Sequence, residues 1–309
     1  MYKQKFAVIS FLFVSLALGF APFAKAQDAD IDKLIKEVST DTQKGAIANY
    51  TYLMKFSYER HKKMAGRKFT RLYEAILPSK FATNRIYTHQ ILLIQDSEKR
   101  LTDEEIMIAR QNLARDLEKA ESDADKQANT PPEYEDGGYW STSFSNEGKR
   151  LKVDILKMLQ NVKLSNLQRR QVDGKDIVTI DFTPKSDGVW EKTMEYLSKI
   201  EGQLTISETD KRIIRIEGFA LGEYAALKEK PDAERQKELV FLFTQMKVAE
   251  GFWFPQTIWI NFAKHPELFQ AVEIQYNFSG YKKASVDVKD SIENPKEPAG
   301  TTITEEKQN

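Results

Sequence analysis

The side chains that most often carry out chemistry are few in this sequence and lie far apart. The three histidines, His61, His89 and His265, lack the close spacing with which imidazoles share a metal ion. The chain has no cysteine, which excludes a thiolate nucleophile, a disulfide and a cysteine-bound metal. The acidic run after Thr102 has the spacing of a helix capping box that ends at Glu105, which explains those carboxylates without acid–base catalysis. The sequence therefore predicts no catalytic residue, no metal site and no cofactor.

The charge balance narrows the classes of partner. Among 309 residues, 46 Lys and Arg residues face 46 Asp and Glu residues, so the formal net charge is zero. Nucleic-acid surfaces usually show as a basic excess or a basic stripe, so we predict no nucleic-acid partner. Hydrophobic residues make up 41% of the chain and charged residues 30%, which is typical of a soluble globular protein.

Residues 1–26 have the features of a cleavable signal peptide. Lys3 contributes to a short basic start, the stretch from Phe6 to Phe20 is mostly apolar, and small residues precede a predicted cut after Ala26. The alternative, an uncleaved membrane anchor, would need about 20 apolar residues. We expect a periplasmic or secreted protein without a stable membrane span after cleavage.

The spacing of apolar residues then separates helices from strands. Helical spacing occurs at 31–38, after Thr102, at 151–162 and around 190–197. Residues 121–148 lose this periodicity and are rich in Pro, Gly, Ser and Asn, which predicts a long loop that is either a lid or a disordered insertion.

Strands make up most of the remaining sequence. Every second residue from Tyr50 to Tyr58 is aromatic or Met, and Asp173-Gly174 is a typical hairpin turn between two further strands. About ten long, consecutive strands predict an α+β fold with one large curved antiparallel sheet and helices packed on or capping one face. We expect a single domain over 27–283 and a flexible polar tail over 284–309.

Several strands are apolar on both faces. In the strand from Phe252 to Phe262, Ile258 and Ile260 share one face while Trp253 and Trp259 occupy the other. Such strands are either covered by protein on both faces or line an apolar cavity on one. An acyl chain of about fourteen methylenes would gain roughly 11 kcal/mol in such a cavity before ordering costs. The candidate cavity residues are Tyr52, Met54, Phe56, Ile214, Ile216, Leu242, Phe254, Ile258, Ile260, Ile274 and Tyr276.

Three segments between residues 163 and 283 resemble a known family. The segment from Glu201 to Gly218, with the sequence EGQLTISETDKRIIRIEG, the strand opening GFWFP from Gly251, and the closing strand Ile274 to Tyr281 are similar to the periplasmic lipoprotein-carrier superfamily of LolA/LolB-like, outer-membrane lipoprotein-sorting proteins. This resemblance implies an unclosed β-barrel with a helical lid over an apolar cavity. It also implies a carrier or sensor of lipoproteins or lipids without catalysis.

Two functions remain open at this point. The first is a periplasmic, non-enzymatic carrier or binding protein that holds an acyl, lipid or lipoprotein moiety. The second is a structural or sensory module of the cell envelope that binds another protein through the sheet or through residues 121–148.

Overall fold

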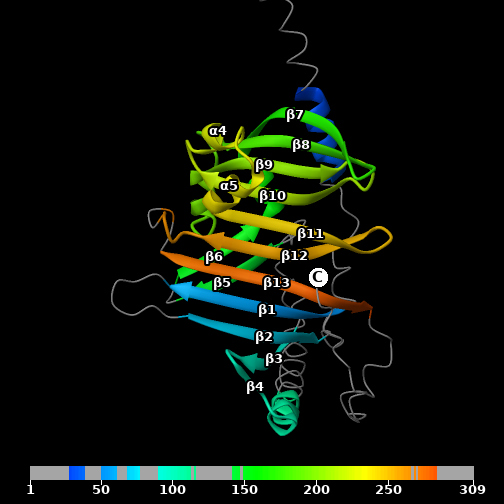
Figure 1. Ribbon diagram of the computed structural model, residues 1–309, viewed down its shortest axis with the longest axis vertical. Coiled ribbons are helices and arrows are strands. Elements are labelled where there is room, and N and C mark those ends of the chain that lie inside the picture. Colours follow the sequence, from blue (N-terminus) through cyan, green and yellow to red (C-terminus); the bar gives the residue numbers. More distant parts are fainter. Residues whose placement is uncertain are drawn as a thin grey trace, which may run out of the picture. The chain divides into compact units, whose positions relative to one another are not determined.

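The computed structural model describes most of the predicted strands, and Figure 1 shows their arrangement. The predicted signal peptide at 1–26, most of the segment 121–148 and the tail at 284–309 lie outside the described residues. Among the described helices, none has both the length and the apolar character needed to cross a membrane. The described residues are 28–38, 50–60, 68–76, 90–112, 115, 141–146, 149–265, 268 and 271–283.

Eleven strands form one open antiparallel sheet in the order β4-β3-β2-β1-β13-β12-β11-β10-β9-β8-β7. This confirms the predicted fold class of one large antiparallel sheet with a few helices. The strands of this sheet are β1 (Tyr50–Arg60), β2 (Lys68–Ile76), β3 (Gln90–Asp96), β4 (Lys99–Arg100), β7 (Val162–Val172), β8 (Lys175–Pro184), β9 (Ile200–Ser207), β10 (Arg212–Ala220), β11 (Phe241–Ala249), β12 (Phe252–Asn261) and β13 (Val272–Lys283).

The chain divides into two compact units. The larger contains residues 1–44, 57–68 and 136–277, and the smaller contains residues 45–56, 69–135 and 278–309. Short helical elements accompany the strands of the larger unit. They are α3 (Ile155–Gln160), the 3-10 helix η3 (Glu195–Lys199), α4 (Tyr224–Leu227) and α5 (Asp232–Glu238), together with a helix over residues 28–38.

The hairpin β7–β8 forms where the turn sequence predicted it. Asp173 and Gly174 both have positive φ angles, 50° and 73°, and their left-handed conformation matches the twist of the two paired strands. The strands stay paired from Val172 and Lys175 at the turn to Val162 and Pro184 at the far end. Glycine tolerates this conformation without strain and aspartate does so better than most residues.

The segment around residue 150 differs from the prediction. Residues 141–146, expected to lie in the loop 121–148, form strand β5 (Ser141–Asn146), which pairs with β6 (Lys149–Asp154) in a separate two-stranded sheet. The expected helix from residue 151 begins only after Asp154, whose carboxylate caps it by accepting a hydrogen bond from the Lys157 amide at 3.1 Å. Apolar residues at 151 and 153 fit a strand as well as a helix, and the cap decides between them.

The smaller unit contains strands β2 to β4, part of β1 and β13, and a helix over residues 103–112. The predicted capping box of this helix is confirmed: the Thr102 amide donates to the Glu105 carboxylate at 2.7 Å, and the Glu105 amide donates to the Thr102 hydroxyl at 3.2 Å. Aromatic rings join neighbouring strands, with ring centres of Tyr52 and Phe278 5.8 Å apart and those of Phe56 and Phe69 5.6 Å apart.

Candidate functional site

The apolar face that the sequence pointed to is a set of aligned rows across six strands of the larger unit. Because cross-strand partners lie on the same face of a sheet, each row can be followed from β8 to β13. One row is Ile180, Leu204, Ile216, Phe243, Ile258 and Tyr276, and the next is Phe182, Gly202, Gly218, Phe241, Ile260 and Ile274. Every side chain in these rows except Tyr276 is buried.

Five of the predicted cavity residues lie in these two rows. Ile216, Ile258 and Tyr276 belong to the first row, and Ile260 and Ile274 belong to the second. The structure therefore places part of the predicted set on one continuous apolar surface.

Two predicted residues lie at or beyond irregularities of the same strands. The pairing of β9 with β10 shifts between Ile213 and Arg215, and the partly buried Ile214 sits at this shift. The pairing of β11 with β12 shifts between Thr244 and Gln245, and Phe254 lies beyond that shift, buried at 3% exposure. Such bulges change which face a side chain occupies.

Leu242 lies on the opposite face, because it pairs with Glu217 and Trp259. This second face carries an apolar patch in which the buried Phe219, Tyr224, Leu227 and Leu239 pack together with Trp259. The rings of Phe219 and Tyr224 stack with centres 5.4 Å apart. Figure 1 shows α4 and α5 on the viewer's side of the large sheet, with α4 at the level of β7 and β8 and α5 in front of β9 and β10. The chain itself thus covers the apolar patch of the second face.

The remaining predicted residues, Tyr52, Met54 and Phe56, belong to the smaller unit. Tyr52 is buried, and Met54 and Phe56 are partly buried. Desolvation raises the pKa of Tyr52 to about 12. These residues are neighbours along one strand, β1, and the structure describes them within that unit.

Separate helical segments cover the face that carries the rows. Arg169 lies opposite Val178, on the same face as the rows, and its guanidinium pairs with Asp30 of the helix 28–38 at 3.4 Å. That helix buries one apolar stripe, including Ile31 and Val38. A second covering segment is η3. The ring centre of its Tyr196 lies 5.6 Å from the ring centre of Phe262, which follows β12. The cover is therefore built from the helix 28–38 and η3, and Figure 1 also shows the two-stranded sheet β5–β6 behind the large sheet.

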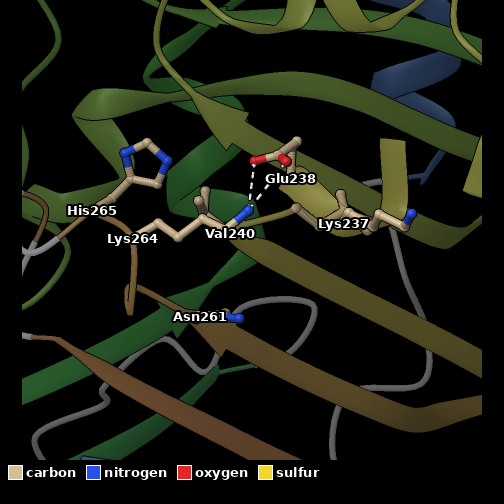
Figure 2. A pocket seen from close by; sticks show the side chains of 7 residues that line it. Lys237, Glu238, Val240, Asn261, Lys264 and His265 are labelled. Carbon is tan, nitrogen blue, oxygen red and sulfur yellow. Dashed lines mark hydrogen bonds and ion pairs between the residues drawn. The ribbon is translucent and has the colours of Figure 1, made fainter. Parts of the chain in front are cut away.

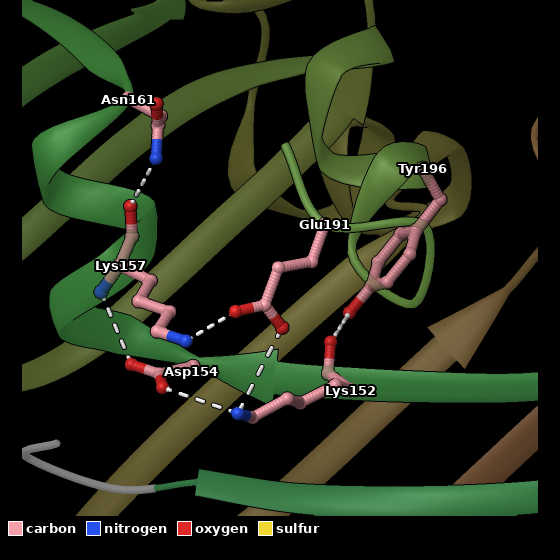
Figure 3. Close-up of polar contacts among 6 residues, drawn as sticks. All are labelled: Lys152, Asp154, Lys157, Asn161, Glu191 and Tyr196. Carbon is pink, nitrogen blue, oxygen red and sulfur yellow. Dashed lines mark hydrogen bonds and ion pairs between the residues drawn. The ribbon is translucent and has the colours of Figure 1, made fainter. Parts of the chain in front are cut away.

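A charged cluster lies where β6, α3 and the segment before η3 meet (Figure 3). The Glu191 carboxylate forms ion pairs with Lys157 and, at 3.9 Å, with Lys152. The hydrogen bond from Lys157, with the field of both lysines, holds the pKa of Glu191 below its ordinary value. Lys152 also lies 3.8 Å from the buried Asp154, whose Oδ2 has no hydrogen-bond partner among the described residues. Sequence reasoning missed this cluster, although the alternation of apolar and charged residues in the run LKVD was a signal for it.

Asn161 links the end of α3 to the segment 185–199 through hydrogen bonds. Its side-chain amide donates to the Lys157 carbonyl at 2.9 Å, and its side-chain oxygen accepts from the Val189 amide at 2.9 Å. The Lys185 amide donates to its backbone carbonyl at 3.0 Å. The segment from 185 to 199, which leads through Glu191 into η3, is thus tied to the end of α3.

A second, polar hollow lies elsewhere in the larger unit (Figure 2). It has an empty volume of about 220 Å³, open to solvent. Lys264 pairs with both oxygens of Glu238 at 3.1 Å across it. The lining residues are Lys237, Glu238, Leu239, Val240, Asn261, Lys264 and His265, none of which belongs to the predicted cavity set.

The described residues contain no group of three or more His, Asp or Glu side chains arranged to hold a metal ion. Of the three histidines, His61 and His89 lie outside the described residues. The ring of His265 lies 3.8 Å from the Glu223 carboxylate, which makes it a member of an ion pair when protonated. The site that stands out is the covered apolar face with the charged cluster at its margin.

Known proteins resemble this chain at the level of solved structures. No protein-family model and no curated protein matches it. A protein domain from Vibrio parahaemolyticus assigned to outer membrane lipoprotein sorting is 10% identical, with 81% of this chain and 93% of that chain covered and a TM-score of 0.29.

Two further solved structures have similar values. A LolA superfamily protein from Nitrosomonas europaea is 6% identical, with 84% and 96% of the chains covered and a TM-score of 0.28. A DUF1329 family protein from Desulfovibrio piger is 12% identical, with 86% and 95% covered and a TM-score of 0.30. The names of the first two, lipoprotein sorting and LolA superfamily, are those of the family that the three sequence segments resemble. Superpositions at these TM-scores carry no residue roles from those proteins to this chain.

Proposed function

We propose that this protein is a non-enzymatic periplasmic carrier or binding protein that holds an acyl chain or another lipid moiety against the apolar rows of β8 to β13. The observation that carries the proposal is the continuity of those rows across six strands under a cover of short, separate segments.

The energetics of acyl binding support this function. The apolar side chains of the rows are already buried, so a ligand must take the place of part of the cover. Each methylene that a lipid buries contributes about 0.8 kcal/mol, so a chain of about fourteen methylenes gains roughly 11 kcal/mol before the costs of ordering and of moving the cover. A net favourable balance therefore requires a long apolar chain, which points to lipids rather than to small polar metabolites.

The test is a photo-crosslinking experiment on the full chain. A fatty acid that carries a diazirine group on its alkyl chain is bound, irradiated, and located by mass spectrometry of the digested protein. We expect labelled peptides from β10 to β13 and from the cover segments, and co-purified lipid in extracts of the native protein. Because binding leaves the sequence unchanged, the result does not depend on a variant that must fold.

The location of the label decides the outcome. Saturable labelling of those peptides that excess unlabelled fatty acid suppresses supports the carrier function. An absence of labelling, or labelling that unlabelled fatty acid does not suppress, would overturn it. In that case a pull-down from envelope extract, with and without residues 121–148, tests the alternative of an envelope module that binds another protein.

A further inference from the structure

Two ammonium groups from different elements converge on one carboxylate. Lys152 comes from β6, Lys157 from α3, and both pair with Glu191, as Figure 3 shows. About half of the Glu191 side chain is exposed, at 46%, whereas the Lys152 side chain is only 17% exposed. Lys152 is thus the most enclosed of the three side chains, whereas Lys157, at 39%, is nearly as exposed as Glu191.

Lys152 lies on the opposite face of β6 from two buried apolar residues. On β6, Lys152 and Asp154 alternate with Leu151 and Val153, which are 3% and 0% exposed. Alternate residues of a strand point to opposite faces. The charged cluster and the apolar layer are therefore separated by the thickness of one strand. After Glu191 the chain runs directly into the buried Met194 and the η3 cover.

We propose that Lys152 and Lys157 form the binding site for the anionic end of an amphiphile, a carboxylate or a phosphate, and that Glu191 occupies this site in the unliganded protein. This inference rests on the proposed acyl-binding function and locates the polar end of the cargo. The Glu191 carboxylate marks the position at which the two ammonium groups hold an anion.

The charge balance of the cluster permits this exchange. In the structure the two lysines are balanced by Glu191 and by the buried Asp154. An incoming carboxylate that replaces Glu191 restores the same balance, and Glu191 is released to water at little cost because it is already half exposed. Because Glu191 belongs to the segment that leads into η3, its release also loosens that part of the cover.

The expected changes in affinity depend on how exposed Lys152, Lys157 and Glu191 are. A hydrogen bond to a charged group contributes more than a neutral one, but solvent screens pairs that are about 40% exposed. We therefore expect the loss of both lysines to weaken binding of an anionic amphiphile about tenfold, and the loss of the Glu191 charge to strengthen it about fivefold.

The experiment compares two fluorescent ligands that differ only in the head, a fatty acid and its methyl ester, by titration in solution. The variants are Glu191→Gln, which keeps the shape of the side chain, and the double variant Lys152→Gln/Lys157→Gln. The control is Lys163→Gln, which removes an exposed charge from β7. Inorganic phosphate is added in a parallel series as a competitor. Circular dichroism checks that each variant is folded.

We expect Glu191→Gln to tighten binding of the acid and the double variant to weaken it, while binding of the ester stays constant and Lys163→Gln has no effect. If phosphate also displaces the acid but not the ester, the anion site is confirmed and accepts free phosphate. If phosphate does not displace the acid, the site binds the anionic end only when it is attached to an acyl chain.

Two results would overturn the inference, and they differ in what they leave standing. If acid and ester respond alike in every protein, the lysines do not recognise the anionic end, although the acyl-binding function survives. If neither ligand binds the wild-type protein, the acyl-binding function fails and this inference fails with it. Glu191→Gln keeps the test decisive even where the double variant does not fold.

Discussion

Gly202 of β9 has no space for a side chain. A Cβ atom built there would lie 1.9 Å from the carbonyl oxygen of Glu217 on the paired strand, and a backbone atom cannot move aside cheaply. We expect Gly202→Ala to lower the free energy of unfolding by about 3 kcal/mol, because the two strands would have to separate or shift. Urea denaturation followed by circular dichroism measures this change.

The matched control is Thr205→Ala on the same strand. Thr205 is partly exposed and pairs with Thr179 and Arg215, and the substitution removes atoms instead of adding one. Its effect should stay below about 1 kcal/mol. Equal effects of the two substitutions would contradict the close approach of the strands at Gly202.

The buried ring of Tyr52 makes stability depend on alkaline pH. Because desolvation raises the pKa of Tyr52 to about 12, the folded state holds this proton more tightly than the unfolded state does. The resulting stability is fully present below the ordinary tyrosine pKa of about 10 and is lost as the pH rises towards 12. A shift of this size corresponds to about 3 kcal/mol.

The measurement is a series of urea denaturation curves between about pH 9 and about pH 12, the range in which tyrosines ionise. We expect the wild-type protein to lose stability across it and Tyr52→Phe to lose less, because phenylalanine has no proton to release. Parallel curves for the two proteins would show that Tyr52 is solvated in the folded state.

At the scale of elements, Asn161 joins α3 to the segment 185–199. Its side chain makes two hydrogen bonds, one to the carbonyl of Lys157 and one from the amide of Val189, each at 2.9 Å. We expect Asn161→Ala to destabilise the protein by about 1–2 kcal/mol and to speed hydrogen exchange of the Val189 amide. Gln160→Ala is the control, since Gln160 is exposed and its backbone carbonyl, which accepts from Lys185, is retained. Equal exchange rates in the two variants would argue against a fastening role.

Short sequence motifs predict an element correctly where the motif is compatible with only one local structure. The Asp173-Gly174 turn and the capping box from Thr102 to Glu105 are both found, because each depends on a few adjacent residues. The start of α3 was misplaced, since apolar spacing alone did not reveal that Asp154 ends a strand and caps a helix. Helix α5 has no buried residue, so the spacing of apolar residues could not predict it.

At the scale of the whole molecule, the sheet was predictable because strand after strand alternates with period two and is joined by short turns. The candidate site was only partly predictable. Simple alternation along β12 predicts that Ile258 and Ile260 share one face, as the pairing shows. That rule fails past a bulge, where Ile214 and Phe254 lie, because one extra residue reverses the sense of the pattern. Nor can alternation show which strands belong to the same compact unit.

The position of β13 between β1 and β12 determines when the sheet can be completed. Among the described strands of this sheet β1 comes first and β13 comes last, so one edge of β1 stays unpaired until β13 has been synthesised. Contacts between such distant parts of a chain form slowly, and the open edge can meanwhile associate with other chains. A newborn chain of this kind benefits from staying unfolded until β13 has emerged.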